Sequence, residues 1–289
     1  MSKITNSPES QFQVSVATPE TWQVVEEMAR QERWDLGKGD AGRFLNVDTQ
    51  GFYIGYWQDK PISSISAVNY TQNYTHVGHY IVNPDFRGQG LGLAVWRIAI
   101  EHAEGRCIGL DGMPAQEANY KKWGFKTHYH TFRMAGAATK NIVELHNIEL
   151  VDQKNIASVI HYDESFVGYS RASLLAEWFF GQGRKGLLKV GNKGIEGVIG
   201  LRPSDDGYRI GPFYAVNEHS MKTLMLAAMN EIPQQTNVTL DIPEYAQQTI
   251  AFANALGFKT LFHTCRMYRG EPLVDYQLGI NALASLELG

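Results

Sequence analysis

The sequence predicts an α+β fold that is built twice in one chain, each copy a mixed, mainly antiparallel sheet flanked by helices. Three observations predict it. The first half contains one strand, two helices, three successive strands, and then helix, strand, helix and strand. The second half repeats segments of the first. Between the two copies, residues 135–140 are mostly small and have the composition of a linker.

Hydrophobic periodicity and turn residues predict the elements of the first half. Residues 12–18 alternate as a strand does, and Thr18 followed by Pro19 marks the start of a helix over 19–33. A glycine-containing loop and a short helix through Phe44 come next. The remaining expected elements are strands at 51–58, 61–70 and 74–83, an apolar helix at 90–104, a strand at 106–111, a helix at 115–123 and a strand at 125–134.

The duplication is clearest in one segment of eleven residues. Gly124–Met134 and Gly257–Met267 are identical at eight of their eleven positions. Asp111 is likewise matched by Asp241, each of them directly after a leucine. Identity at this density indicates an internal repeat rather than chance.

The segment that follows the third of the successive strands is the most informative for function. A strand that enters a glycine-rich turn at a helix start is a general anion site, because backbone N–H groups and the helix dipole point at the ligand. The spacing excludes a dinucleotide fingerprint, since Leu93 stands where the third glycine is needed, and no Gly-Lys-Ser/Thr triplet forms a Walker loop. The segment reads Val82-Asn83-Pro84-Asp85-Phe86-Arg87-Gly88-Gln89-Gly90-Leu91-Gly92.

This pattern of proline, arginine and glycines resembles the acyl-CoA pyrophosphate loop of the GNAT superfamily of N-acetyltransferases. The order of elements is also the GNAT order, and the chain is similar to the YitH-like tandem GNAT subgroup, over roughly residues 12–289. The further motifs that carry the resemblance are Trp34-Asp35 with Gly37 and Asp40, Gly78-His79-Tyr80-Ile81-Val82, Leu110-Asp111-Gly112, and Gln116-x-x-x-Tyr120-x-x-x-Gly124-Phe125.

The resemblance implies that acetyl-CoA binds as the acyl donor. A backbone N–H near Ile81 or Val82 would polarise the thioester carbonyl, and the loop would hold the pyrophosphate. The residues expected to bind the cofactor are Ile81, Val82, Arg87, Gly88, Gln89, Gly90, Leu91 and Gly92.

Three residues are candidates for catalysis. Tyr120 lies four residues before Gly124, where GNAT proteins place the tyrosine that protonates the departing thiolate, although a tyrosine there can also simply pack on the sheet. His79 is a candidate base for the amine or a packed polar residue of the strand. Asp111 is a candidate for catalysis and for binding a cationic amine, or a structural cap that both copies share because Asp241 repeats it. The resemblance also places Trp34, Asp35 and Tyr80 beside the acceptor.

The second copy lacks the cofactor loop. After Asn217 it has Glu218 and no proline, arginine or glycine before Leu224, and the position that matches Tyr120 is Ala253. The sequence therefore predicts a cofactor-binding domain over 1–136 and a degenerate GNAT-like domain over 141–289.

Composition narrows the classes of partner. The net charge of −4 and pI near 6.1 give no reason to expect nucleic acid. The longest apolar run is too short to span a bilayer, and the polar opening residues lack the core of a signal peptide, so we expect no membrane partner and a cytoplasmic location. Two cysteines provide neither a disulfide framework nor a CxxC metal site, and no metal is expected.

These observations and the resemblance together predict an acetyl-CoA-dependent N-acetyltransferase that acts on the amine of a small molecule. The alternatives are a protein or peptide N-acetyltransferase and a non-catalytic acyl-CoA sensor. With two GNAT-like domains in one chain, we expect a monomer that contains an intramolecular pseudo-dimer.

Overall fold

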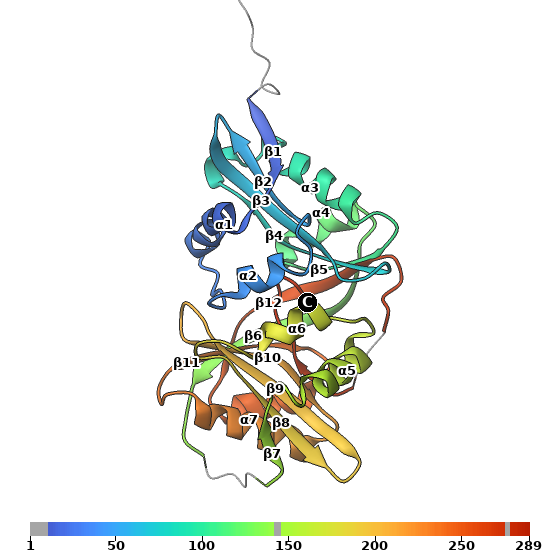
Figure 1. Ribbon diagram of the computed structural model, residues 1–289. Coiled ribbons are helices and arrows are strands. Elements are labelled where there is room, and N and C mark those ends of the chain that lie inside the picture. The colour runs from blue at the N-terminus through green and yellow to red at the C-terminus, as the bar shows by residue number, and fades with distance from the viewer. Residues whose placement is uncertain (1–10, 142–145, 275–277) are drawn as a thin grey trace, which may run out of the picture.

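The computed structural model describes residues 11–141, 146–274 and 278–289. In Figure 1 the first half forms the upper part of the molecule and most of the second half forms the lower part. The first half contains β1 (Phe12–Val16), α1 (Pro19–Gln31), α2 (Asp40–Leu45), β2 (Phe52–Trp57), β3 (Lys60–Asn69), β4 (Tyr74–Val82), α3 (Leu91–His102), β5 (Cys107–Gly112), α4 (Glu117–Lys121) and β6 (Lys126–Ala137).

The second half has a similar order of elements. Its elements are β7 (Ile148–Leu150), α5 (Ile156–Val167), α6 (Ala172–Trp178), β8 (Lys185–Gly191), β9 (Gly194–Pro203), β10 (Tyr208–Ala215), α7 (Glu218–Glu231), β11 (Asn237–Pro243), α8 (Gln247–Ala255), β12 (Lys259–Arg269) and β13 (Ile280–Ala282).

Local signals explain where the elements of the first half begin and end. The Thr18 side chain caps α1 by accepting from the backbone N–H of Thr21, and Pro19 occupies the first helical position. Each element predicted for the first half is present, with ends that differ by a few residues. The fold class predicted from the sequence is confirmed.

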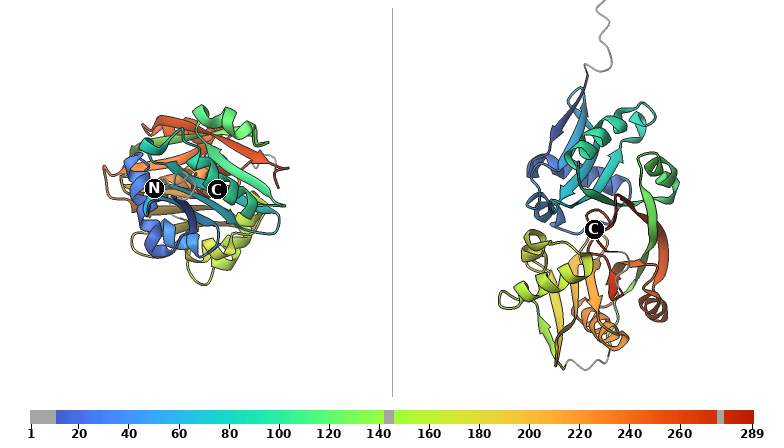
Figure 2. Two further views of the ribbon diagram at one scale, coloured as in Figure 1. Left: turned by 90° about the horizontal axis from the view of Figure 1, so that it is seen from above. Right: turned by 90° about the vertical axis from the view of Figure 1, so that its right-hand side faces the viewer.

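One continuous sheet of thirteen strands joins the halves, and each half completes the sheet of the other. The order of strands is β1-β2-β3-β4-β5-β12-β6-β11-β10-β9-β8-β7, with β13 beside β10. Strand β12 of the second half pairs with β5 of the first, and β6 of the first half pairs with β11 of the second. Figure 2 shows β6 and β12 as long neighbouring strands that cross from one half to the other. Strands β6 and β12, which contain most of the repeated segment, are therefore exchanged.

Crossed ion pairs accompany the exchange. Arg133 on β6 is opposite Asp241 on β11, with its Nε 2.7 Å from the carboxylate. At the matching position of the repeat, Arg266 on β12 is opposite Asp111 on β5, and its Nη2 lies 2.6 Å from Oδ2. The repeated aspartate is thus the partner of an arginine on an exchanged strand.

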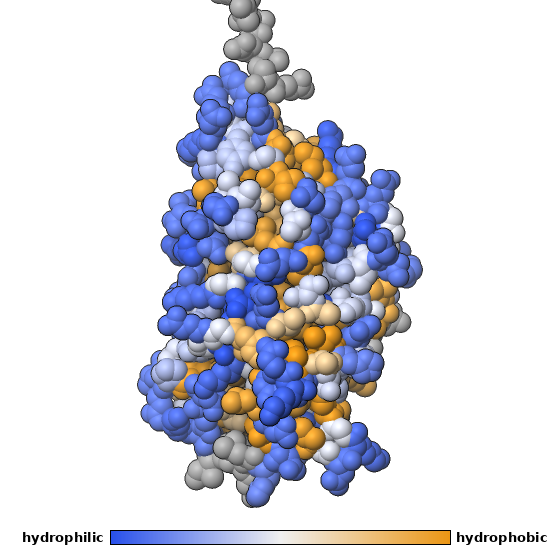
Figure 3. All heavy atoms as spheres, viewed as in Figure 1, coloured by the Kyte–Doolittle hydropathy of each residue, from blue (hydrophilic) through white to orange (hydrophobic). Residues whose placement is uncertain are grey.

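The halves also share a hydrophobic core. One cluster of buried side chains combines Trp22 and Phe44 of the first half with Trp178 and Leu188 of the second. The rings of Phe44 and Trp178 are 5.6 Å apart. On the face drawn in Figure 3, hydrophilic residues cover the outer edges and apolar residues gather along the middle, over the strands of both halves.

The C-terminal tail, residues 278–289, fills a gap in the sheet of the second half. Strands β10 and β11 pair in parallel only as far as Ile210 and Leu240. Beyond that point β13 pairs with β10, and the backbone N–H of Leu283 donates to the carbonyl of Asp241 on β11. The chain itself therefore occupies the space between these two strands.

No helix among the described residues has the length and apolar character needed to cross a membrane.

Candidate active site

The equivalent gap in the first half is open. Strands β4 and β5 pair in parallel from Tyr74 with Cys107 to Val77 with Leu110, and they separate beyond that point. The gap leads into a cavity of about 690 Å³, which is within the usual range for sites that hold small molecules. Separation of two strands thus creates the main cavity of the first half.

A β-bulge shapes the strand that borders the gap. Ser66 is opposite Gly78 and Ser64 is opposite Ile81, so two residues of β4 face one residue of β3. The extra pair includes His79, whose φ of 48° lies in the left-handed region. Bulges often occur beside active sites, where they redirect side chains and end regular pairing.

The hydrogen-bond pattern distinguishes the two amides predicted to polarise the thioester. The N–H of Asn83 donates to the carbonyl of Ile62 on β3. Because successive amides of an antiparallel strand point to opposite sides, the N–H of Ile81 points towards β3 and the N–H of Val82 points away from it. The Arg87 Nε donates to the Val82 carbonyl at 2.8 Å, which agrees with this orientation. The Val82 N–H faces the gap, whereas Ile81 packs in the core.

The glycine loop, residues 88–92, leaves its backbone N–H groups without hydrogen-bond acceptors in the part of the chain that the structure describes. Gly88 and Gly90 have φ values of 74° and 80°, which side-chain-bearing residues rarely adopt. A Cβ on Gly92 would lie 2.7 Å from Val82 Cγ2 and 2.8 Å from the Tyr80 hydroxyl, so α3 can approach β4 only with glycine there. Among the described residues, the amides of 88–92 have no backbone acceptor.

Arg87 lies at the rim of the cavity. Its guanidinium contacts the Glu32 carboxylate at the end of α1, and its side chain is 51% exposed. Gln89 donates to the Asp85 carbonyl and steadies the turn. The residues of the predicted cofactor set that line the cavity are Ile81, Val82, Arg87, Gly88, Gly90 and Gly92, whereas Gln89 and Leu91 do not.

Tyr120 lines the same cavity from α4. Its ring packs 5.5 Å from that of Trp96 on α3, and it is partly buried. Burial, with a smaller effect from Tyr80, raises the pKa of the phenol above its usual value. The group therefore keeps its proton at neutral pH, as a general acid requires.

His79 also lines the cavity, and its side chain is buried. Its Nδ1 is 3.0 Å from the Ser66 hydroxyl, and its ring meets that of Trp22 edge-on at 5.2 Å. Burial lowers the pKa of His79 to about 4, although Glu287 and Asp40 oppose the shift. Among the described residues Nε2 has no hydrogen-bond partner, and His79 lines both this cavity and a small one of about 20 Å³ beside Trp22 and Phe44.

Asp111 is closed to an incoming amine by its partners. Its side chain has no exposed surface. Oδ2 faces Arg266 in an ionic contact that is not a well-aligned hydrogen bond. Oδ1 accepts a hydrogen bond from the Thr264 hydroxyl at 3.2 Å. Burial raises the pKa of Asp111, and Arg266 opposes this. Of the roles predicted for Asp111, this placement favours the structural one that Asp241 repeats.

The remaining expected acceptor residues divide into two groups. Trp34 and Tyr80 line the cavity, and the Trp34 ring lies 6.5 Å from that of His79. Asp35 instead faces the second half, where its Oδ1 accepts from the Asp206 N–H and its carbonyl accepts from Arg209. Asp35 is not part of the cavity wall.

The sequence reasoning did not identify the residues that the exchanged strands and the tail contribute to the wall. The repeated segment was a signal for the strands, but it did not say which sheet each strand joins. Ser285-Leu286-Glu287-Leu288-Gly289 is similar to the ending of the YitH-like tandem GNAT subgroup, but this similarity did not place the tail in the cavity wall. These lining residues are Arg133, Phe262, Thr264, Leu286 and Glu287.

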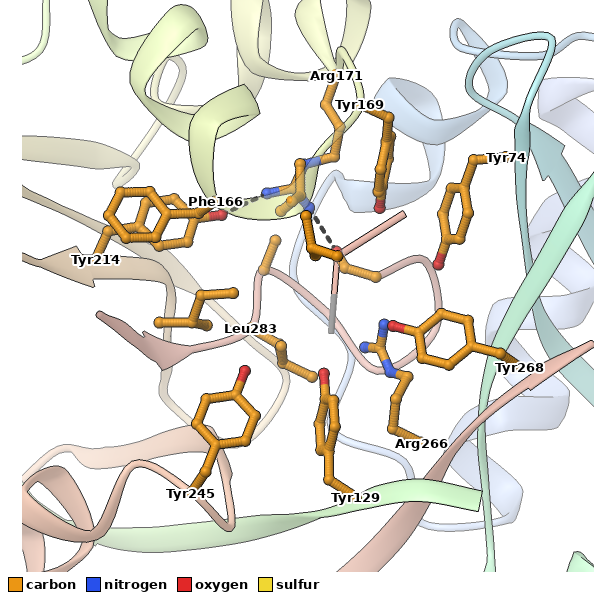
Figure 4. A pocket seen from close by; sticks show the side chains of 15 residues that line it. Tyr74, Tyr129, Phe166, Tyr169, Arg171, Tyr214, Tyr245, Arg266, Tyr268 and Leu283 are labelled. Carbon is orange, nitrogen blue, oxygen red and sulfur yellow. Dashed lines mark hydrogen bonds between the residues drawn. The ribbon is translucent and has the colours of Figure 1, made fainter. Parts of the chain in front are cut away.

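A second, much smaller cavity of about 50 Å³ lies where the halves and the tail meet (Figure 4). Arg171 crosses it and donates to the Tyr214 hydroxyl and to the Gly289 carbonyl. Tyrosines surround it, and it is too small for an acyl-CoA. The described residues contain no cluster of three or more His, Cys, Asp or Glu side chains suited to hold a metal ion.

Comparison with known proteins agrees with this geometry. Residues 13–125 match the acetyltransferase (GNAT) family and residues 159–277 match an acetyltransferase (GNAT) domain. Holothin acyltransferase of Pseudoalteromonas sp. (strain SANK 73390) is 45% identical over 273 residues, which cover 94% of this chain and 93% of that protein.

Two solved structures show the same fold at low identity. A candidate acetyltransferase from Pyrococcus horikoshii has a TM-score of 0.81 and 19% identity over 99% of this chain and 98% of its own. A tandem GNAT protein from the clavulanic acid biosynthesis pathway has a TM-score of 0.61 and 15% identity over 90% of this chain and 98% of its own. The chain therefore belongs to the GNAT family of acyltransferases, with two GNAT domains in tandem.

Proposed function

We propose that this acyltransferase transfers an acetyl group from acetyl-CoA to the amine of a small molecule. The observation that carries the proposal is the cavity of about 690 Å³ that joins the open glycine loop, the Val82 amide and Tyr120 to a wall formed by the exchanged strands and the tail. The donor fits the first part of this cavity, because open amides at a helix start are suited to a pyrophosphate.

The residues of the cavity suggest how the transfer proceeds. The Val82 N–H stabilises the negative charge that develops on the carbonyl oxygen as the amine attacks. Tyr120 protonates the thiolate sulfur as the carbon–sulfur bond breaks. His79, which is neutral at neutral pH, accepts the proton that the nitrogen loses, through Nε2.

The identity of the acceptor rests on two kinds of support. The relative that is 45% identical is named for holothin, which makes holothin the first acceptor to test. On the acceptor side, β12 contributes Phe262 and Thr264 to the wall and the tail contributes Leu286 and Glu287, which suits an enclosed acceptor. Both points favour a small molecule over the alternative of a protein or peptide acceptor. Tyr120 in the cavity and the acyltransferase relative favour catalysis over the alternative of an acyl-CoA sensor.

The test is a thiol-release assay with acetyl-CoA, holothin and a set of small amines and peptides, with products identified by mass spectrometry. We expect one N-acetylated product for each thiol released, with a small amine and not with peptides. Longer acyl-CoA donors should be compared in the same assay, because the donor is proposed to be acetyl-CoA. Efficient acetylation of peptides alone would reject the small-molecule acceptor.

A further inference from the structure

The walls of the large cavity carry carboxylates, and each one among the described residues has an arginine partner. Glu32 contacts Arg87 at the rim. The other two pairs are enclosed. Arg266 lies 2.6 Å from Asp111, and the Arg209 Nη1 lies 3.5 Å from the Glu287 Oε1.

The arginine that lines the acceptor side is also neutralised. The Arg133 guanidinium makes two hydrogen bonds to Asp241, at 2.7 and 2.9 Å, and its Nη2 lies 3.9 Å from Glu287. Arg209 donates to the same Asp241. Two arginines and two carboxylates thus form one buried group with no net charge.

We infer that the acceptor is a compact amine that is uncharged at neutral pH, such as an arylamine, and not an alkylammonium ion or a polyamine. This inference rests on the proposed function and names the class of its acceptor. An ammonium ion that enters the cavity loses hydration, and carboxylates already paired with arginines in a low-dielectric wall do not compensate that loss. A neutral amine avoids this cost.

The apolar part of the wall fits the same class. Trp34 from the first half, Phe262 from β12 and Leu286 from the tail line the cavity and are buried or partly buried. Aromatic faces favour planar rings through stacked or edge-to-face contacts. The only hydroxyl that β12 contributes to the described wall is that of Thr264, which already donates to Asp111 and keeps an accepting lone pair.

Proton transfer at His79 agrees as well. The carboxylates that face its ring are Glu287 and Asp40, Ser66 bonds its Nδ1, and burial outweighs both charges and keeps its pKa at about 4. So weak a base does not deprotonate an alkylammonium ion. An arylamine attacks as the free base, and its nitrogen becomes acidic once the carbon–nitrogen bond forms. His79 then accepts that proton while Tyr120 protonates the departing sulfur, so that protons and charges balance.

A pair of isomers tests the inference, because 4-methylaniline and benzylamine have the same atoms and differ in charge at pH 7. With acetyl-CoA and the full chain, we expect 4-methylaniline to give a kcat/KM at least about tenfold higher, although it is the weaker nucleophile in water. Equal or higher kcat/KM for benzylamine, or efficient turnover of spermidine, would overturn the inference.

A binding measurement separates this inference from the proposed function. Calorimetric titration of the CoA-saturated protein should show binding of 4-methylaniline and much weaker binding of benzylamine. If 4-methylaniline binds selectively but no amine, holothin included, is acetylated, the proposed transfer fails while the charge selection stands. Tighter binding of benzylamine, or binding of neither isomer, counts against the charge selection.

A variant that adds an unpaired carboxylate should change the selectivity. Met113 lines the cavity and is 47% exposed, so Met113→Glu is expected to fold. We expect the ratio of kcat/KM for 4-methylaniline to kcat/KM for benzylamine to fall by about tenfold. A tenfold change corresponds to about 1.4 kcal/mol, which is the expected size of one attractive contact between the new carboxylate and the ammonium ion. Met113→Gln, with the same shape and no charge, should keep the wild-type ratio. An unchanged ratio in Met113→Glu would contradict the role of charge.

Discussion

His79 combines an unusual backbone with an unusual environment. Its φ of 48° belongs to a bulge of β4, and its ring is buried beside Trp22 with one nitrogen engaged by Ser66. Backbone strain of this kind persists only where the surrounding structure enforces it, and it often occurs at functional sites. Tyr120 faces the same cavity from α4 and has the opposite property, a proton that burial makes harder to remove.

Replacing Tyr120 by phenylalanine should lower turnover by about 10²-fold, the usual scale for the loss of one proton-transfer group. Affinity for acetyl-CoA should change little, because we propose that the phenol acts on the sulfur and not on the phosphates. Steady-state thiol release and calorimetric titration measure the two effects separately. Turnover equal to wild type would move the general acid to another group.

The buried His79 should make stability depend on pH. Its folded pKa of about 4 lies below the unfolded value of about 6.5, so the unfolded chain binds the proton more readily and stability falls as the pH drops from 6.5 towards 4. Between pH 7 and 4.5 this residue should account for a loss of about 2–3 kcal/mol.

Denaturant unfolding of His79→Asn at both pH values tests this, since asparagine tolerates the left-handed backbone and does not titrate. The loss of stability on acidification should be smaller in the variant by about the same amount. The same loss in both proteins would mean that His79 titrates normally.

At the scale of elements, the site depends on how β4, the glycine loop and α3 meet. The bulge and the separation from β5 direct the Val82 amide to the cavity, and Gly92 lets the helix start close to the strand. The loop then presents open amides at the positive end of α3. Together these features suit the anionic donor that we propose.

The double variant Arg87→Ala, Gly90→Glu should abolish acetyl-CoA binding without unfolding the protein. It removes a guanidinium at the rim and places a carboxylate, on a backbone with φ of 80°, beside the pyrophosphate site. Calorimetric titration measures the affinity, and circular dichroism checks the fold. Arg87→Lys is the control that keeps the charge, and unchanged affinity in the folded double variant would reject the loop as the donor site.

At the scale of the whole molecule, the two halves do not fold as separate units in space. Strands β6 and β12 are exchanged, a core cluster contains residues of both halves, and the tail fills the gap between β10 and β11. The predicted division into 1–136 and 141–289 follows the sequence repeat, whereas the sheet pairs β6 and β12 with strands of the other copy. We propose that the second half supports the first and closes its acceptor side without binding a donor.

The full chain should bind one acetyl-CoA per molecule and be active as a monomer. The tail already occupies the second gap, and Glu218 stands at the start of α7 in place of the glycine loop. Titration of the donor and light scattering of the active protein measure both quantities. Two donor sites per chain would contradict the degenerate second half.

Residues 1–138 expressed alone should aggregate, because β5 loses β12, β6 loses both of its neighbours, and the shared core is exposed. Co-expression with residues 139–289 should restore a soluble complex, and solubility measured for both preparations tests this. A soluble and fully active 1–138 fragment would remove the supporting role of the second half.

The sequence by itself determined the features that depend on local physical rules. Hydrophobic periodicity predicted the elements, and the cap and proline at 18–19 predicted the start of α1. The glycines after Arg87 predicted a turn before α3, and Gly88 and Gly90 in that turn have positive φ. The resemblance to GNAT proteins, through the position of Tyr120 four residues before Gly124, implied a tyrosine at the site, and the structure places Tyr120 in the cavity wall. Such features depend on residues close in the chain, so a single sequence contains them.

Only the tertiary structure decided which strand pairs with which sheet and what the tail does. The alternation of β6 is the same whether the strand pairs with β5 of its own half or with β11 of the other, so periodicity cannot distinguish the two. The role of Asp111 depends on the exchange, because its partner Arg266 lies on β12, and the role of Glu287 depends on how the tail packs against Arg209 of β10. The acceptor wall is made of long-range contacts, and for that reason no local pattern predicted it.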